Sequence, residues 1–314
     1  MIQKKCSIVV SVYNEEAVLP HFHNELCSKT QNIGYSIEII YVNDGSIDTS
    51  AAKLDQIADS DNRVKVLHFS RNFGHEAAMT AGIDYASGDV VICMDSDLQN
   101  PPELLPDMLQ AYEKGNDIVT MMREDREDGG LYKSVFSKMF YRILNHLSEM
   151  QLQPNVSDFF LLSKPVADVL RKDYRERTRF MRGFVQTLGF RRTSISYRAP
   201  RRAAGESKYS FRKLLRFALS SMASFSKIPL KIGIYSGIMF GLLSVALIIY
   251  SIIMWIVNRP VGGYTTLIIF LSAFAAISLI VIGIIGYYIG FILDEVKGRP
   301  IYVVERVTTR EDER

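Results

Sequence analysis

The chain has 314 residues, enough for about two domains, and its formal net charge is only +3 at pH 7. The charge is uneven, because fifteen Lys and Arg residues stand against three Asp and Glu residues between positions 171 and 216. That basic segment leads into a long apolar stretch. We therefore expect it to face anionic lipid head groups, and we exclude nucleic acid as a partner. The three cysteines show neither metal-ligand nor disulfide spacing, which fits a reducing compartment.

Strand-like and helix-like segments alternate over the first 120 residues. Short apolar runs predict strands at residues 7–12, 37–42, 64–69, 90–94 and 117–122. The segments between them predict helices at residues 15–33, 48–60, 75–86 and 102–114. Asp48 or Thr49 is the expected N-cap of the second helix. This rhythm predicts an α/β fold with a doubly wound, mostly parallel sheet.

The pattern weakens after Met122. We expect a loop at residues 123–130, a helix at 131–150, a strand at 157–163, a helix at 180–188 and a strand at 191–198. Residues 211–228 combine apolar and basic positions, which is typical of a helix lying on a membrane surface, although an ordinary surface helix has a similar composition.

Two uncharged stretches follow, 27 residues long at 232–258 and 34 residues long at 260–293. A membrane span needs about 20 apolar residues, so these stretches predict two transmembrane helices rather than a pair of core helices. Basic residues flank the pair on one side, and the loop between them carries only Arg259. The positive-inside rule then places both chain ends in the cytoplasm. We expect residues 301–307 to form a lone strand or an extended tail, which could pair with a neighbouring chain.

Asp95 and Asp97 come directly after the predicted strand at 90–94. In an open α/β sheet, ligands bind just beyond the carboxyl ends of the strands. Two hard oxygen donors at that place suit a Mg²⁺ or Mn²⁺ ion that also holds a diphosphate. An isolated Asp-x-Asp is more often part of a turn or a helix cap, so the assignment depends on what surrounds it.

Glu15 and Asp44 follow the first and second predicted strands and should lie at the same edge as Asp95 and Asp97. Four acidic side chains at one rim are costly unless a cation or hydrogen-bond donors join them. A nucleotide with its metal would do so, because carboxylates accept hydrogen bonds from a base N–H and from ribose hydroxyls. The alternative, that residues 44–46 form only a turn, accounts for the backbone but leaves the clustering unexplained.

Four motifs carry a resemblance to a known family: VVSVYNEE at 9–16, VNDGS at 42–46, RNFG at 71–74 and MDSDLQNPPE at 94–103. In order and spacing they resemble the family-two glycosyltransferases of GT-A fold. GESKY at 205–209 and the two apolar stretches are similar to the polyisoprenyl-phosphate glycosyltransferases, both dolichol-phosphate mannose synthases and, more closely, bacterial bactoprenol glucosyltransferases. The resemblance covers essentially the whole chain. Ser11 departs from the proline common at its position.

The resemblance implies a role for particular residues. It implies nucleotide contacts at Tyr13, Glu15, Asp44 and Asp95, and metal and diphosphate contacts at Asp95 and Asp97, with Gln99 near the sugar. It implies acceptor-phosphate contacts at Arg123, Arg202 and Lys208, and it places Asp158 near the reacting centre as a base or an orienting group. A phosphate monoester is largely dianionic at neutral pH, so a strong base, such as nearby His68 or His75, is not required.

The resemblance also implies a domain organisation. A cytoplasmic catalytic domain would span residues 1–208, followed by amphipathic juxtamembrane helices at 209–231. Transmembrane helices would span residues 232–258 and 264–293, and a cytoplasmic tail would span 294–314. We expect a multi-pass protein of the inner (plasma) membrane without a signal peptide, since the apolar run at 7–12 is too short for one. The family suggests a homotetramer.

The expected reaction is an inverting transfer of a single sugar to undecaprenyl phosphate on the cytoplasmic membrane face. UDP-glucose is the best guess for the donor, with GDP-mannose among the alternatives. A processive polysaccharide synthase is excluded, because its Gln-x-x-Arg-Trp motif is absent: Ile252, Ile253 and Met254 precede the single tryptophan, Trp255. A catalytically inactive membrane scaffold is the alternative from another class, and the intact acidic residues argue against it.

Overall fold

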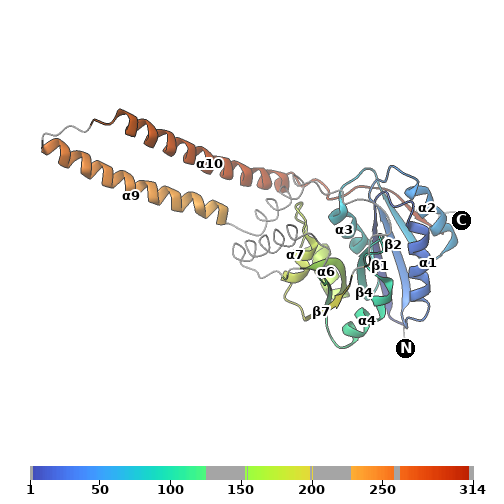
Figure 1. Ribbon diagram of the computed structural model, residues 1–314. Coiled ribbons are helices and arrows are strands. Elements are labelled where there is room, and N and C mark those ends of the chain that lie inside the picture. The colour runs from blue at the N-terminus through green and yellow to red at the C-terminus, as the bar shows by residue number, and fades with distance from the viewer. Residues whose placement is uncertain are drawn as a thin grey trace. The chain divides into compact units, whose positions relative to one another are not determined.

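The structure is a computed structural model that describes residues 3–124, 153, 155–198, 200, 228–257 and 262–310. The chain divides into two compact units: a sheet-based domain, which includes the C-terminal residues from Pro300, and a pair of long helices (Figure 1). The predicted helix at 131–150, most of the predicted juxtamembrane segment at 209–231 and the motif at 205–209 lie outside the described residues.

The described strands form one eight-stranded sheet in the order β7-β5-β6-β4-β1-β2-β3-β8. The strands are β1 (Lys5–Val12), β2 (Ser36–Asn43), β3 (Val64–Phe69), β4 (Val90–Asp95), β5 (Ile118–Arg123), β6 (Val156–Ser163), β7 (Arg192–Tyr197) and β8 (Val304–Thr309). Strand β1 pairs in parallel with β2 and β4, β2 with β3, and β5 with β7. Strands β6 and β8 run antiparallel to their neighbours. The predicted mostly parallel α/β sheet is therefore confirmed.

The helices of the domain connect the strands and cover both faces of the sheet. They are α1 (Leu19–Thr30), α2 (Ser50–Ser60), α3 (His75–Tyr85), α4 (Leu105–Glu113), α6 (Lys164–Lys172) and α7 (Met181–Thr187), with a 3-10 turn, η1 (Pro102–Leu104), before α4. Helix α1 begins later than predicted, since residues 16–18 form a turn. At α2 the N-cap position is Thr49, but the side chain that bonds the first turn is Asp48, whose Oδ1 accepts from Ser50 N at 2.9 Å.

Side-chain alternation along the strands creates two packed faces. One face forms the main core with α1, α2 and α4, and it buries large side chains such as Phe22, Tyr41 and Phe159 completely. The other face packs on α3, where Gly82 lies directly against Val9 of β1. Because strands buried on both faces need little alternation of polar residues, the parallel strands read as continuous apolar runs in the sequence.

The C-terminal tail corrects one prediction. Residues 301–307 were expected as a lone strand or extended tail, free to pair with a neighbouring chain. Instead the chain continues into β8, which pairs antiparallel with β3 of the same chain and lies beside α2 (Figure 1). The outermost strand of the sheet beside β3 is thus a strand that follows the apolar helices in sequence.

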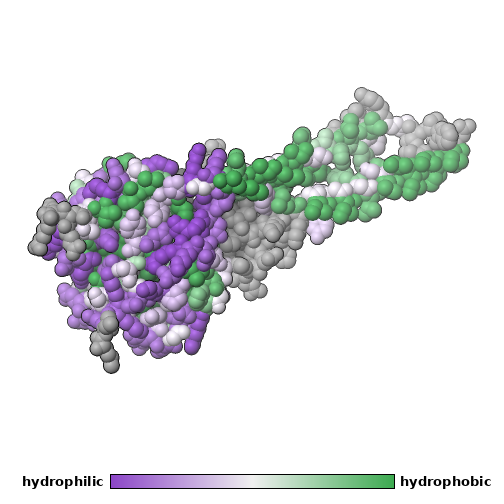
Figure 2. Space-filling model, turned by 180° about the vertical axis from the view of Figure 1, so that it is seen from behind, coloured by the Kyte–Doolittle hydropathy of each residue, from purple (hydrophilic) through white to green (hydrophobic). Residues whose placement is uncertain are grey.

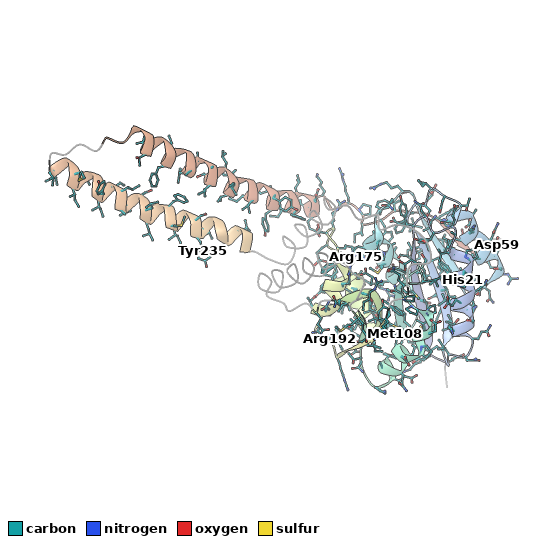
Figure 3. All side chains as sticks on the ribbon, in the orientation of Figure 1. His21, Asp59, Met108, Arg175, Arg192 and Tyr235 are labelled. Carbon is teal, nitrogen blue, oxygen red and sulfur yellow. The ribbon has the colours of Figure 1, made fainter. Side chains whose placement is uncertain are left out.

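The second unit consists of two long helices, α9 (Ile228–Ile256) and α10 (Tyr264–Val296). Within them, Gly233–Met254 and Ala273–Val296 are long enough and apolar enough to cross a membrane, and none of either window is buried. Their surface is apolar along most of its length, in contrast to the hydrophilic surface of the domain (Figure 2). Tyr235 projects outward from α9 and is 68% exposed (Figure 3). These helices match the expected spans closely in position.

Candidate active site

The sheet brings the predicted acidic residues together at the edge where the carboxyl ends of its parallel strands lie. Strands β1, β2 and β4 are neighbours and run in parallel, with Ser11 opposite Asp95 and Val12 opposite Asn43. Their carboxyl ends therefore meet, and the residues that follow them in the sequence meet there too. These are Tyr13 and Glu15 after β1, Asp44 after β2, and Asp95 and Asp97 at the end of β4.

Asp44 is almost fully buried, with 3% of its surface exposed, and its carboxylate is held by a neighbouring loop. Its Oδ1 accepts from Phe73 N at 2.7 Å, and its Oδ2 accepts from Gly74 N at 3.0 Å and from Asn72 Nδ2 at 2.9 Å. Burial raises the pKa of Asp44, and the two backbone N–H donors oppose that rise. Asp44 thus anchors the loop at 72–74, and its contact with a nucleotide stays a prediction.

Asp95 is only partly buried and is oriented by Ser11. The Ser11 hydroxyl donates to Asp95 Oδ1 at 3.0 Å, and Asp97 Oδ1 accepts from Gln99 N at 3.0 Å. Ser11, the departure from the family's usual proline, therefore contributes a hydrogen bond that proline lacks. Two carboxylates held in this way fit a Mg²⁺ or Mn²⁺ site, since such ions typically take one or two protein carboxylates and complete their shell with substrate phosphates and water.

His75, which the sequence reasoning set aside, links the two ends of the site. Its Nδ1 lies 3.0 Å from Ser11 Oγ and 3.5 Å from Asp95 Oδ1, while its Nε2 lies 3.6 Å from Asp158 Oδ2. The Ser11 hydroxyl donates its single proton to Asp95, so Nδ1 of His75 must carry a proton and donate it to Ser11 Oγ. Burial alone would lower the pKa of His75, but the carboxylates of Asp95 and Asp158 outweigh it and raise that pKa well above its usual range.

Asp158 is held from its other side by Arg182 of α7, whose Nε lies 2.8 Å from Asp158 Oδ1. Burial acts to raise the pKa of Asp158, yet Arg182 and His75 together hold it well below its usual range. A general base works best with a pKa near the operating pH. The arrangement therefore favours the orienting role for Asp158 over the role of a base.

Arg123 and Gln99, both predicted, are brought together at the end of β5. The Arg123 guanidinium donates from Nη1 to Gln99 Oε1 at 3.1 Å and from Nε to the Tyr197 hydroxyl at 3.0 Å. That hydroxyl in turn donates to Asn100 Oδ1 at 3.1 Å. Arg123 is thus fixed in position by three side chains beside the Asp-x-Asp turn. The other predicted acceptor residues, Arg202 and Lys208, lie outside the described residues.

Comparison with known proteins decides the family. Residues 7–171 match the family model described as glycosyl transferase family 2. The chain belongs to this family. Its predicted GT-A fold class and its nature as a glycosyltransferase enzyme are thereby confirmed.

Relatives that match this glycosyltransferase over nearly the whole of both chains agree with that assignment. An uncharacterized glycosyltransferase, YkcC of Bacillus subtilis (strain 168), is 37% identical over 303 residues, which cover 96% of this chain and 93% of the relative. The SfII prophage-derived bactoprenol glucosyl transferase of Shigella flexneri is also 37% identical over 303 residues, covering 96% of this chain and 98% of the relative. A prophage bactoprenol glucosyl transferase homolog of Escherichia coli (strain K12) is 36% identical over 304 residues, covering 96% and 99%.

Sequence reasoning missed three members of the glycosyltransferase site, namely Arg182, Tyr197 and Asn100. Tyr197 and Arg182 come from β7 and α7, far from the rim motifs in sequence, and only the fold brings them close.

A separate group of potential metal ligands exists among the described residues, in which the ligand atoms of His23, Cys27 and Asp61 lie within 4.8 Å of one another. The Arg63 guanidinium donates to both Cys27 Sγ, at 3.1 Å, and Asp61 Oδ2, at 2.6 Å, and so already supplies the positive charge there.

Proposed function

We propose that this glycosyltransferase moves one sugar from a nucleotide-diphosphate donor to the phosphate of a polyisoprenyl phosphate, with inversion at the anomeric carbon. The observation that carries the proposal is the juxtaposition of an acidic pair, Asp95 and Asp97, with a fixed arginine, Arg123, through the Gln99 turn. An acidic pair suits a metal-bound diphosphate, and a fixed guanidinium suits a second phosphate. The printed names of relatives, bactoprenol glucosyl transferases, support a polyisoprenyl acceptor.

On the donor side, Asp95 and Asp97 would hold Mg²⁺ or Mn²⁺, which when bound neutralises the charge that develops on the departing diphosphate. The chain's own part is to fix these carboxylates. Ser11 orients Asp95, and the Gln99 N–H orients Asp97. Tyr13, Glu15 and Asp44 follow the neighbouring strands β1 and β2 at the same end of the sheet, which supports their proposed contacts with the nucleotide.

On the acceptor side, a lipid phosphate is already a nucleophile, because its second pKa near 6 leaves it largely dianionic at neutral pH. The main difficulty is holding it against the anionic donor, which needs fixed cations. Arg123 is one such cation, and we propose Arg202 and Lys208 as its companions. Asp158 is held ionised by Arg182 and His75, orients these two side chains and need not accept a proton.

The finer features of the proposal rest on resemblance. Glucose from UDP-glucose is the favoured donor, because the relatives are named glucosyl transferases, and GDP-mannose is the alternative. The two apolar helices support an inner-membrane protein with its catalytic domain and both termini in the cytoplasm. A homotetramer is proposed from the family alone. An inactive scaffold is disfavoured, because the acidic pair and Arg123 are present and oriented.

The proposal is tested with membranes that contain the full chain, undecaprenyl phosphate and radiolabelled UDP-glucose or GDP-mannose, with Mn²⁺ or with a chelator. Labelled lipid should form with one donor only when the metal is present. Asp95→Asn and Asp97→Asn should each reduce that product to background, whereas Asp107→Asn, an exposed carboxylate on α4, should not. Unchanged turnover in either rim variant would remove the metal assignment.

A second experiment separates the acceptor site from the donor site. Arg123→Gln and Lys208→Ala should raise the KM for the lipid phosphate much more than the KM for the nucleotide-sugar, because each removes a cation from the phosphate site. An effect confined to the nucleotide-sugar would contradict the acceptor role.

A further inference from the structure

The C-terminal segment from Tyr302 to Thr308 packs beside the loop at 70–74 and is linked through side chains to the turn at 43–46, which carries Asp44. This segment comes only a few residues after α10 ends at Val296, and it belongs to the sheet domain. Two separate chains of contacts lead from it toward Asp44, one through aromatic rings and one through polar side chains.

The aromatic path begins at Tyr302. Its ring stacks on Phe69 with centroids 5.3 Å apart and planes at 9°, and Phe69 meets Phe73 edge-on at 5.7 Å. Phe73 is the residue whose backbone N–H donates to Asp44 Oδ1 at 2.7 Å. The backbone joins in as well, because Ser70 N donates to Val303 O at 3.1 Å. The loop that holds Asp44 is thus packed against the C-terminal segment.

The polar path begins at Arg306. Its guanidinium donates to both oxygens of Asp55, at 2.9 and 2.7 Å, and Asp55 Oδ1 lies 3.0 Å from His68 Nε2. His68 is buried, and its Nδ1 lies 3.0 Å from Asn43 Nδ2. Asn43 Oδ1 then accepts from Ser46 N at 3.0 Å. This path therefore fixes the turn at 43–46, which carries Asp44 itself.

The two paths meet at Gly45. Its backbone has φ +63°, and a Cβ at this position would overlap the backbone of Arg71 and Asn72. The turn at 43–46 and the loop at 70–74 are therefore packed backbone to backbone, so a shift of either loop must move the other.

We propose that residues 302–308 are a positioning element of the donor site, which holds the two loops around Asp44 in the arrangement that binds the nucleotide. The inference rests on the proposed function insofar as that function places a nucleotide at Asp44. It assigns to the segment after the apolar helices a role in binding, in addition to extending the sheet next to β3. Tyr302 and Arg306 act through other residues and need not touch the substrate.

The test measures nucleotide binding by the full chain in detergent micelles, with Mn²⁺ and whichever of UDP and GDP the unchanged protein binds more tightly. Tyr302→Ala should raise the Kd roughly three- to tenfold, the equivalent of one lost aromatic pair. Tyr302→Phe, which keeps the ring on Phe69 but loses the hydrogen bond of the hydroxyl to Asp84, should restore most of the affinity. Glu305→Gln, three residues further along the same segment, is the matched control.

Two further measurements guard against a merely misfolded variant. Arg306→Met interrupts the other path and should also raise the nucleotide Kd, while the KM for the lipid phosphate stays unchanged. Hydrogen–deuterium exchange should speed up at the amides of Phe73 and Gly74 in Tyr302→Ala, because these N–H groups donate to Asp44.

The outcomes separate this inference from the proposed function. If Asp44→Asn weakens nucleotide binding but Tyr302→Ala and Arg306→Met leave it unchanged, the positioning role is wrong and the donor site stands. If Asp44→Asn also binds the nucleotide normally, the placement of the nucleotide at Asp44 is wrong, and the inference fails with it.

Discussion

Arg123 and Tyr197 are register partners on the paired strands β5 and β7, and their side chains are joined by a hydrogen bond of 3.0 Å from Nε to the hydroxyl. The tyrosine hydroxyl accepts this bond and donates another to Asn100, so it ties the arginine to the turn after Asp97. The parallel register of two strands thus decides where the cation proposed to bind the acceptor phosphate lies.

Tyr197→Phe should therefore weaken the use of the lipid phosphate while the protein stays folded. The loss of a hydrogen bond to a charged group costs roughly 1.5–3 kcal/mol, so we expect a tenfold or greater fall in kcat/KM for the acceptor. Tyr35→Phe is the matched control, because its hydroxyl also donates to a side chain, Glu113, outside the site. Equal effects of the two variants on the acceptor would contradict a specific role for Tyr197.

Asp158→Asn distinguishes an orienting carboxylate from a base. Arg182 and His75 hold the pKa of Asp158 below its usual range, so it stays ionised at any pH where the enzyme would be assayed. The variant removes the charge that pairs with Arg182, and such a loss costs about 1–3 kcal/mol. We therefore expect kcat to fall roughly five- to 150-fold. The shape of the pH–rate profile should stay the same.

The measurement is kcat across neutral and mildly alkaline pH for the unchanged protein and the variant, with Asp168→Asn, a more exposed partner of Arg171, as the control. Loss of one limb of the profile in Asp158→Asn alone would show that Asp158 does exchange a proton.

The sequence allowed the strands and the acidic rim to be predicted because both depend on local patterns. Buried parallel strands are uninterrupted apolar runs, and the residues after them must meet at one edge whatever the loops do. Helix α6 was not predicted, because it is only nine residues long and buries only Val166, Ala167 and Leu170. Strand β8 was expected only as a lone strand or an extended tail, because its partner β3 is more than 200 residues away in sequence.

The same reasoning explains which site residues escaped prediction. Asp95 and Asp97 stand in a compact motif, whereas Arg182 and Tyr197 reach the site from elements that carry no motif. His75 was visible beside the loop at 71–74, but its role depends on a hydrogen bond that it donates to Ser11, and the pairing of β1 with β4 places that serine beside Asp95. Long-range pairings of this kind leave no periodic signal in a single sequence.

Gly82→Ala should destabilise the domain, because α3 approaches β1 too closely for a side chain. A Cβ on Gly82 would overlap Val9 Cγ1, and Val9 is fully buried and has no room to move away. Overpacking of this kind costs roughly 1–3 kcal/mol, even though alanine favours helix formation. Gly34→Ala is the control, since nothing lies within 4 Å of a Cβ there. Thermal unfolding that is equal in the two variants would show that α3 can shift at little cost.

The contribution of His68 to the stability of the domain should fall as the pH is lowered from 7.5 to 5.5. Burial and the nearby Arg306 lower the pKa of His68, although Asp55 and Glu305 oppose this. In this pH range His68 therefore binds more protons in the unfolded state than in the folded state, and its contribution to stability must decrease with decreasing pH. The loss begins as the pH falls through about 6.5, the ordinary histidine pKa, and is complete below the lowered pKa of the folded state.

His68→Gln should reduce that pH dependence, because glutamine does not titrate. On going from pH 7.5 to 5.5 in detergent micelles, the Tm of His68→Gln should fall less, or rise more, than the Tm of the unchanged protein, by about 2–4 °C for each kcal/mol of linkage removed. His23, whose pKa burial also lowers, contributes with the same sign, so some dependence should remain. A difference in Tm that is unchanged in His68→Gln would show that His68 gains no proton on unfolding in this range.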